Sequence, residues 1–400
     1  MTVKVSKPAI NVREELADLR KPTGIAGEAM LRAETPQEQF QLIGAGRRNL
    51  IINGDMRIAQ RGTSASSPAD GGYTNVDRFQ VYRNGAGVLQ TGQSGVAPDG
   101  FKNSLLVECA TADTSIAGAD FGGISYYVEA QDLLGTALGT ASAKPLTLSF
   151  WVRANLTGLY SVAVRQPNST VDSYVDTYYI NAVDTWEYKT ITIAPDTGVG
   201  NWTMTGNGRG LQVAFALWNG GSYGGAEYGK WLPDTNDVGS SENVNFVSST
   251  SNVFRITGVQ LELGKVATPF EHRSYGEELA ACQRYFCRPI SNVDEDGNSN
   301  VHNAIGVGRG AGNGAVVVWS LLTPVPLRDR PEITSSGSYY LTDATSRTSA
   351  TPTLVVINQF TVNGSNLLAH YTFSSSVCDD DRVVMVGGHT AVKIDLDAEL

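Results

Sequence analysis

The sequence predicts a mainly β protein built from two β-sandwiches, the larger over residues 47–273 and the smaller over residues 289–400. Four hundred residues exceed one ordinary core, so two or three domains are expected. Strand-sized apolar runs recur along most of the chain, separated by Gly, Pro, Asn and Asp. The 43 Gly and 16 Tyr, with five Met, favour strands joined by tight turns. Because no alternation of strands with helices is visible, we expect antiparallel sheets packed face to face.

A strand followed by a capped helix joins the two predicted sandwiches. Residues 253–263 alternate with a period of two, which is typical of a half-buried strand. Ser274 with Glu277 three positions later forms a capping box, which predicts the start of a linking helix over residues 274–288. Pro289 predicts its end, after an apolar stripe at i, i+3 and i+7 formed by Leu279, Cys282 and Phe286.

The larger sandwich is predicted from a series of short runs. It opens with NLIINGDMRIAQRG, which indicates a short strand, an Asn-Gly turn and a second strand. Residues 131–138 are expected to form a helical turn. The remaining predicted strands are VDRFQVYR, SLLVECA, GGISYYVEA, PLTLSFWVRAN, YSVAVRQ, WEYKTITI, LQVAFALWN and FRITGVQLEL.

The smaller sandwich is predicted to hold six or seven strands. They are NAIGVGRG, GAVVVWSLL, SYYLTD, TLVVINQFTV, LLAHYTF and the long run RVVMVGGHTAVKIDL. The segment TPVPLRDRP, with its three prolines, is expected to be an extended crossing rather than a central strand. Gly306–Gly314 resembles a phosphate-binding loop only superficially, because an apolar strand rather than a helix follows it.

Residues 1–46 do not read as a globular domain. Asn11 with Glu14 predicts one short helix, and Thr35 followed by Pro36 predicts a second. Two such helices cannot bury enough surface alone, so they need another copy of the chain or another protein as a partner. A disordered leader is the alternative.

Charge and cysteine usage exclude several classes of function. The net charge of −10 and the scattered basic residues argue against a nucleic-acid partner. Cys109, Cys282, Cys287 and Cys378 lack zinc-ligand spacing and are expected to be reduced, packed thiols. No apolar run approaches the roughly 20 residues of a membrane span. The start also lacks the apolar core of a signal peptide, so ordinary secretion is not expected.

Several segments resemble bacteriophage tail-fibre and receptor-binding proteins. NLIINGDMRIAQRG with YTNVDRF resembles the opening of the carbohydrate-binding jelly-roll modules of phage tail proteins. ITGVQLELGKVATPFEHRSYGEELAACQRYF resembles the end of that module and the helix after it. PVPLRDRPEIT resembles a crossing segment of the tip domains. TGIAGEAMLRAETPQEQFQLIGAGRRNL resembles leaders of virion proteins from phages of marine cyanobacteria.

The resemblance implies a jelly roll, a homotrimer, and attachment to other phage tail proteins through residues 1–46. It also implies a virion location after assembly in the host cytoplasm, and host surface polysaccharide or lipopolysaccharide as the partner. Members of the family often hold a structural calcium, for which Asp55, Gln260 and Glu262 are the positions here. Because Gln260 replaces an acid, calcium is possible but not expected, and no cofactor is predicted.

The candidate sugar site is the stretch LWNGGSYGGAEYGKWLPDTND. A sugar needs an aromatic ring face together with planar amides or carboxylates. The candidates are Trp218, Tyr223, Tyr228 and Trp231. Among them, Trp218 is the one we most expect to be buried in the core, because it ends an apolar strand. The alternative for the others is packing over a sheet edge. A weaker aromatic set is Tyr174, Tyr178 and Tyr179.

No enzymatic activity is predicted. The acid pairs Asp172 with Asp176 and Asp234 with Asp237 could suit a polysaccharide hydrolase, but 40 acidic residues make such pairs inevitable. The four histidines accompany no GxSxG motif. The predicted function is therefore a non-catalytic tail fibre that adsorbs to a host glycan. A purely structural tail or baseplate component and a polysaccharide depolymerase are the alternatives.

Overall fold

A computed structural model describes Arg32 and residues 48–400, apart from residues 65, 168–171, 199–201, 226, 234–236, 292–303, 310–314, 330, 343–346, 351, 357–365 and 374–382. The chain divides into two compact units, residues 1–50 and residues 51–400. The predicted helical leader, residues 1–46, lies outside the described residues except for Arg32. The predicted boundaries at residues 273 and 288, within the second unit, stay predictions.

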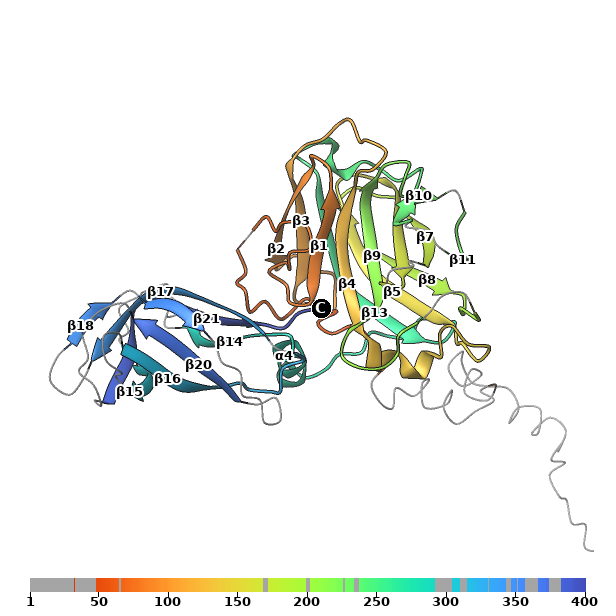
Figure 1. Ribbon diagram of the computed structural model, residues 1–400. Helices are drawn as coiled ribbons and strands as arrows, with labels where there is room; N and C mark the ends of the chain where they lie inside the picture. Colours follow the sequence, from red (N-terminus) through yellow and green to blue (C-terminus); the bar gives the residue numbers. More distant parts are fainter. Residues whose placement is uncertain are drawn as a thin grey trace, which may run out of the picture. The chain divides into compact units, whose positions relative to one another are not determined.

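Two antiparallel sheets face each other in the larger sandwich (Figure 1). The six-stranded sheet has the order β1 (Phe79–Asn84), β4 (Phe121–Glu129), β9 (Arg209–Asn219), β6 (Gly158–Arg165), β7 (Ser173–Ile180) and β11 (Trp231–Leu232). The five-stranded sheet has the order β2 (Val88–Ser94), β3 (Ser104–Thr111), β13 (Val253–Leu263), β5 (Leu146–Ala154) and β8 (Glu187–Ile193). The chain crosses repeatedly between them, and the fold is a jelly-roll β-sandwich, as predicted.

Aromatic side chains join the two sheets in the core. The ring centroid of Phe150 on β5 lies 5.1 Å from that of Phe215 on β9 and 5.1 Å from that of Tyr178 on β7. Tyr160 and Phe254 meet in the same way at 5.8 Å. Because successive side chains of a strand alternate between faces, these inward rings fix which residues of each strand point out of the sandwich.

Shorter elements complete the larger sandwich. The predicted helical turn is the 3-10 helix η1 (Ala130–Thr136). A second 3-10 helix, η2 (Phe246–Ser248), precedes β13. The segment after β9 forms a small parallel pair, β10 (Gly224–Gly225) with β12 (Gly239–Ser240).

Two sequence predictions, one about the opening segment and one about strand β13, need correction. The opening segment forms turns and no strand, because the Asn53 amide is buried and bonds Ile58 and Asp77 instead of a strand partner. Strand β13 is buried on both faces from Ile256 to Glu262, rather than half-buried along its length. Its polar residue Gln260 is fully enclosed, because its side-chain oxygen accepts the Glu271 N–H of the elbow that folds back over it.

The linking helix is shorter than predicted. The capping box of Ser274 and Glu277 is confirmed, and α4 (Tyr275–Gln283) follows it. The chain then enters β14 (Phe286–Ser291), so Phe286 and Cys287 belong to a strand and not to the predicted helix. Pro289 lies where the β14 ladder shifts register, a position at which a strand tolerates the missing N–H.

The smaller sandwich also consists of two sheets (Figure 1). One has the order β14, β21 (Val383–Asp397), β17 (Glu332–Thr342) and β18 (Arg347–Ala350), with β15 (Ala304–Arg309) also paired to β21. The other has the order β16 (Ala315–Leu322), β20 (Asn366–Phe373) and β19 (Pro352–Val356). Residues 323–329 cross between β16 and β17 without regular structure, as the prolines predict.

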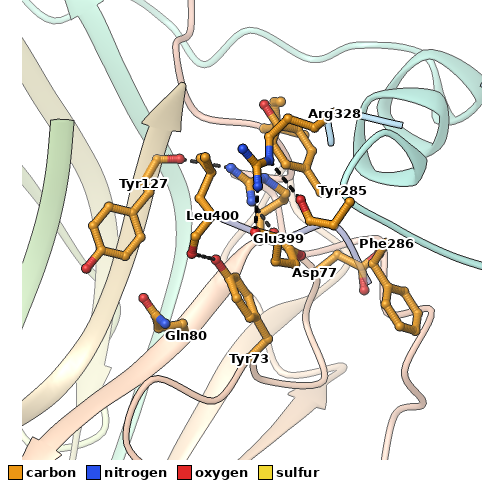
Figure 2. A network of polar contacts seen from close by, with 12 residues as sticks. Tyr73, Asp77, Gln80, Tyr127, Tyr285, Phe286, Arg328, Glu399 and Leu400 are labelled. Carbon is orange, nitrogen blue, oxygen red and sulfur yellow. Dashed lines mark hydrogen bonds and ion pairs between the residues drawn. The ribbon is translucent and has the colours of Figure 1, made fainter. Parts of the chain in front are cut away.

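A buried polar network ties residues 393–400 to the larger sandwich (Figure 2). At its centre Glu399 pairs with Arg78, and Arg61 Nη1 lies 3.5 Å from the second oxygen of Glu399. The guanidinium of Arg78 is enclosed, lies 3.5 Å above the ring centroid of Tyr285, and donates to the Tyr127 carbonyl at 2.9 Å. Buried charges of this kind require their partners, because removing one leaves the other uncompensated.

Further contacts extend this network along the same segment. Arg61 pairs with Asp397 at 2.9 Å, and Arg288 holds Asp395 with two hydrogen bonds. Arg328, from the crossing segment, donates to the Ala398 and Glu399 carbonyls at 2.8 and 2.9 Å. Charge-assisted hydrogen bonds therefore hold this segment along most of its length.

Candidate functional site

Polar and aromatic side chains gather on the outer face of the six-stranded sheet. Tyr127 of β4, Gln212 of β9 and Arg165 of β6 are direct neighbours in register, so they form one row on that face. Tyr82 of β1 lies two rows away on the same face, since it is opposite Gly123 and since strand faces alternate. We call Tyr82, Tyr127, Arg165 and Gln212 the tyrosine–arginine face.

The residues between these side chains are small. Gly123, Ser125, Ala163 and Ala214 occupy the intervening positions of β4, β6 and β9. A Cβ at Gly123 would lie 3.1 Å from the Tyr82 hydroxyl and 1.9 Å from the Phe215 carbonyl oxygen. Glycine at 123 and small side chains at the other three positions therefore leave room above the sheet for the phenol of Tyr82.

The segment after β9 covers one part of this face and leaves another open. Tyr223 and Val238 pack on a cluster that includes Tyr82, Ala163 and Ala214. A hydrogen bond from the Ser240 N–H to Ser161 Oγ fixes the segment to β6 at 2.9 Å. Tyr127 and Arg165 stay partly exposed, so the open part lies at their row.

Arg165 is the charged centre of the face. Burial lowers the pKa of its guanidinium, and the neighbouring Tyr82, Tyr127, Tyr223 and Asp237 oppose that shift. An arginine stays protonated in proteins, so a desolvated cation faces three phenols and one carboxylate. Its Nη1 donates to Gln212 Oε1 at 3.3 Å, which orients both planar groups.

The Tyr82 hydroxyl is buried and, among the described residues, has no hydrogen-bond partner. Burial raises the pKa of this phenol, so it remains a neutral O–H donor and acceptor. A buried polar group without a partner costs stability, and such groups in native structures call for an explanation. This hydroxyl lies under the segment that carries Tyr223 and Val238, so a ligand hydroxyl could become its partner only where that segment moves aside.

The network of residues 393–400 borders the same face. Arg209 lies 4.4 Å above the Tyr127 ring centroid and donates to the Leu400 oxygen at 2.8 Å. Tyr73 donates to the same oxygen at 2.9 Å, and Figure 2 shows Tyr73, Tyr127 and Gln80 around Leu400. The position of Tyr127 is thus set partly by the joint.

Two of the sugar-contact residues predicted from the sequence lie by this face. Tyr223 is half-buried, with its ring centroid 4.6 Å from that of Phe121, and it acts electrostatically on Arg165. Tyr228 is 36% exposed, and its hydroxyl is 2.7 Å from Ser240 Oγ. Both belong to the segment that covers the sheet, so Tyr223 and Tyr228 remain candidates for ligand contact.

The two predicted tryptophans lie elsewhere. Trp231 pairs with Tyr174 at the sandwich edge, stands 5.4 Å from Trp202, and donates from Nε1 to the Ala194 carbonyl. Trp218 is buried in the core over Gly122, so its ring cannot contact a sugar in this conformation and its place among the candidates needs correction. An apolar strand end is where a core tryptophan was already expected.

The calcium-site residues carry other contacts in this fold. Asp55 pairs with Arg57. The Glu262 carboxylate accepts hydrogen bonds from Gln260 Nε2 and from both the N–H and the hydroxyl of Thr268. Across the described part of the chain, no group of three His, Cys, Asp or Glu residues could hold a metal ion. Gln260 and Glu262 hold the elbow after β13 through these contacts, and a calcium site that is possible but not expected stays a prediction.

Asp172, Asp176 and Asp237 are the described members of the acid pairs considered for hydrolysis. Asp172 is buried, and the half-buried Asp176 accepts the N–H of Thr177 at 2.8 Å, while burial raises the pKa of Asp176. Asp234 lies outside the described residues. Non-catalytic function stays a prediction. Among the described helices, none has the length and apolarity to cross a membrane.

The face suits hydroxyl-rich ligands. Planar groups such as guanidinium and amide can bond pairs of neighbouring hydroxyls, and phenol rings can cover the C–H side of a sugar ring. Sequence analysis missed Tyr82, Tyr127, Arg165 and Gln212, because each stands in an ordinary strand. Their period-two position was the only signal, and it does not indicate which strands become neighbours.

The sequence matches no protein-family model and no curated protein. Solved structures match in fold. The enzymatically active domain of bacteriophage CBA120 tailspike protein 4 aligns over 54% of this chain and 21% of its own, with 12% identity and a TM-score of 0.29. The family 11 carbohydrate-binding module from Clostridium thermocellum aligns over 53% of this chain and 99% of its own, with 13% identity and a TM-score of 0.26. These similarities concern the fold alone.

Proposed function

We propose that this chain is a non-catalytic phage tail fibre that binds a host-surface glycan through the tyrosine–arginine face. Its segments resemble phage tail proteins, which supports a virion location, a homotrimer and attachment to other tail proteins through residues 1–46. The ligand is a host surface polysaccharide or lipopolysaccharide. Three linked copies would raise the effective affinity of a shallow site by about 10² to 10⁴.

One observation carries the proposal. The buried Tyr82 hydroxyl has no partner among the described residues, and it shares a face with the desolvated guanidinium of Arg165 and the amide of Gln212. Such an arrangement is costly for folding and useful for binding, because a ligand can bond Arg165 and Gln212 at the open row and the Tyr82 hydroxyl once the segment of Tyr223 and Val238 moves aside.

The test is the conservative variant Tyr82→Phe. Removing a buried, unpartnered hydroxyl should leave the free energy of unfolding unchanged or slightly raised. Binding of the full-length variant to cyanobacterial cells and to their purified lipopolysaccharide should weaken by roughly tenfold, since one hydrogen bond to a ligand is lost. Arg165→Gln should weaken binding further, because it removes a charged and bidentate donor.

Tyr178→Phe is the matched control. Its hydroxyl is also buried without a partner, but its ring packs against Phe150 in the core. Equal binding by Tyr82→Phe and wild type would remove the support for this face. Wild-type protein that decorates no cells would favour a structural tail component. Loss of polysaccharide chain length during incubation would favour a depolymerase, and sedimentation as a monomer would contradict the trimer.

A further inference from the structure

The opposite side of the larger sandwich carries a pair of arginines beside two aromatic rings. Arg153 of β5 and Arg255 of β13 are directly opposite in register. Both point away from the core, because their strand neighbours Val152, Ala154 and Phe254 are buried in it. Like charges directly opposite each other destabilise a sheet, so this pairing is unfavourable for the fold alone.

The two arginines differ in their partners. Arg153 donates from Nε to the Asp184 carbonyl at 2.8 Å, and its Nη2 lies 3.3 Å from the Asp184 carboxylate. The Arg255 side chain makes no hydrogen bond or ion pair with any described residue, and its Nε is buried. Burial and then Arg153 lower the pKa of Arg255, while Glu108 and Asp184 oppose the shift.

The acids flank the arginine pair and do not separate it. Glu108 is on β3, on the far side of Arg255 from Arg153, and Asp184 pairs with Arg153 from the turn before β8. Leu106 is directly opposite Arg255 on β3, and Glu108 lies diagonally from it, so the two arginines put positive charge at the centre with an acid on either side. A single anionic group placed between the guanidiniums would remove their repulsion and bond both planar forks.

An aromatic platform lies next to this positive centre. Trp151, two positions before Arg153 and on the same face, is opposite Tyr188 of β8. The ring centroids are 5.3 Å apart, and Tyr188 is 44% exposed. Gly258, at a φ of 63° in a bulge of β13, makes room for the Phe101 and Trp151 rings, since a Cβ there would lie 2.8 Å from the first and 3.1 Å from the second.

We infer that this arginine-pair face (Trp151, Arg153, Tyr188 and Arg255) is a second glycan site, selective for saccharides that carry a carboxylate. The sugar ring packs on Tyr188 and Trp151, and its carboxylate sits between the two guanidiniums. The inference rests on the proposed function, in which the chain binds a glycan. It does not require that the tyrosine–arginine face also binds one. The two faces belong to different sheets, so they can act separately.

The test uses the full-length chain, with polygalacturonate as the acidic probe and dextran as a neutral polymer. Isothermal titration calorimetry should show that wild-type protein binds polygalacturonate and that added salt weakens the binding, because the contact is ionic. Arg255→Gln and Tyr188→Ala should each weaken it by about tenfold or more. Both side chains are at least partly exposed, so the variants should keep the wild-type melting temperature.

Controls separate this site from the tyrosine–arginine face. Tyr275→Ala removes another exposed tyrosine, on α4, and should change nothing. Tyr82→Phe should leave polygalacturonate binding intact. If Tyr82→Phe abolishes that binding and Arg255→Gln does not, polygalacturonate binds at the tyrosine–arginine face. The inference then fails and the proposed function stands.

Three other results would also overturn the inference. Equal binding of polygalacturonate and dextran by wild-type protein would exclude selectivity for carboxylates. Absence of any polygalacturonate binding would exclude the site itself. If Arg255→Gln instead converts an oligomer to a monomer in sedimentation without changing glycan binding, this face is a contact between copies of the chain.

Discussion

Replacing Glu399 by Gln should expose how strongly the joint depends on one buried ion pair. The change keeps the shape of the side chain and removes its charge. Arg78 then stays enclosed, with the Tyr127 carbonyl and the Tyr285 ring as its nearest compensation. Breaking a buried pair by removing one partner costs about 3–5 kcal/mol, and Glu399 is itself only 4% exposed.

The loss of stability can arise with residues 393–400 docked or detached, and different measurements distinguish the two cases. If residues 393–400 remain docked, the free energy of unfolding falls by the full amount, and urea denaturation followed by tryptophan fluorescence will show it. If the segment detaches, water reaches Arg78 and the global loss is smaller. In that case the Ala398 N–H, which donates to the Tyr285 carbonyl at 2.7 Å, loses its protection from hydrogen exchange.

A double variant decides whether the charge is responsible. Arg78→Met with Glu399→Leu removes both charges and fills similar volume, so stability should recover most of the loss. The reasoning is refuted if Glu399→Gln unfolds within about 1 kcal/mol of wild type while the Ala398 N–H stays protected. It is equally refuted if the double variant is as unstable as the single one.

Two further predictions concern the core and its pH dependence. Burial raises the pKa of Asp77 from 3.8 to about 6, so the native state holds a proton that the unfolded chain releases, and stability falls as pH rises through this window. The difference in unfolding free energy between Asp77→Asn and wild type should therefore shift in favour of the variant between pH 4 and pH 7, by about 3 kcal/mol at most; a pH-independent difference would contradict it. Gly122→Ala should lower stability by about 1–3 kcal/mol, because the new Cβ would lie 2.1 Å from the Trp218 ring. Gly135→Ala, with nothing within 4 Å, is its control, and equal melting temperatures would refute the clash.

The start of helix α4 could be predicted from the sequence, because its signal lies within a few residues. Ser274 and Glu277 meet through backbone and side chain within one helical turn, so the cap could be predicted without any tertiary knowledge. The end of that helix could not. Phe286 continues the apolar spacing of a helix, yet the ladder with β21, a hundred residues later, makes it a strand residue.

Strands with several polar residues were also predicted poorly from the sequence. β2, with the sequence VLQTGQS, was not predicted, because its polar residues and Gly92 weaken the strand signal. It forms because β3 supplies backbone hydrogen bonds along its whole length. The polar residues of β13 are buried for a similar reason, since Thr268 and Glu271 of the elbow satisfy them.

The sequence by itself determined the β class, the two sandwiches, the capped helix and the free thiols of Cys109, Cys282 and Cys287. Turn residues, apolar periodicity and caps act over a few positions, so they are legible along the chain. The tertiary structure alone decided which side chains share a face. Tyr82, Tyr127, Gln212 and Arg165 come from strands that are not consecutive, and only the order β1-β4-β9-β6 makes them neighbours. Sheet order depends on the burial of whole faces, which no short segment encodes.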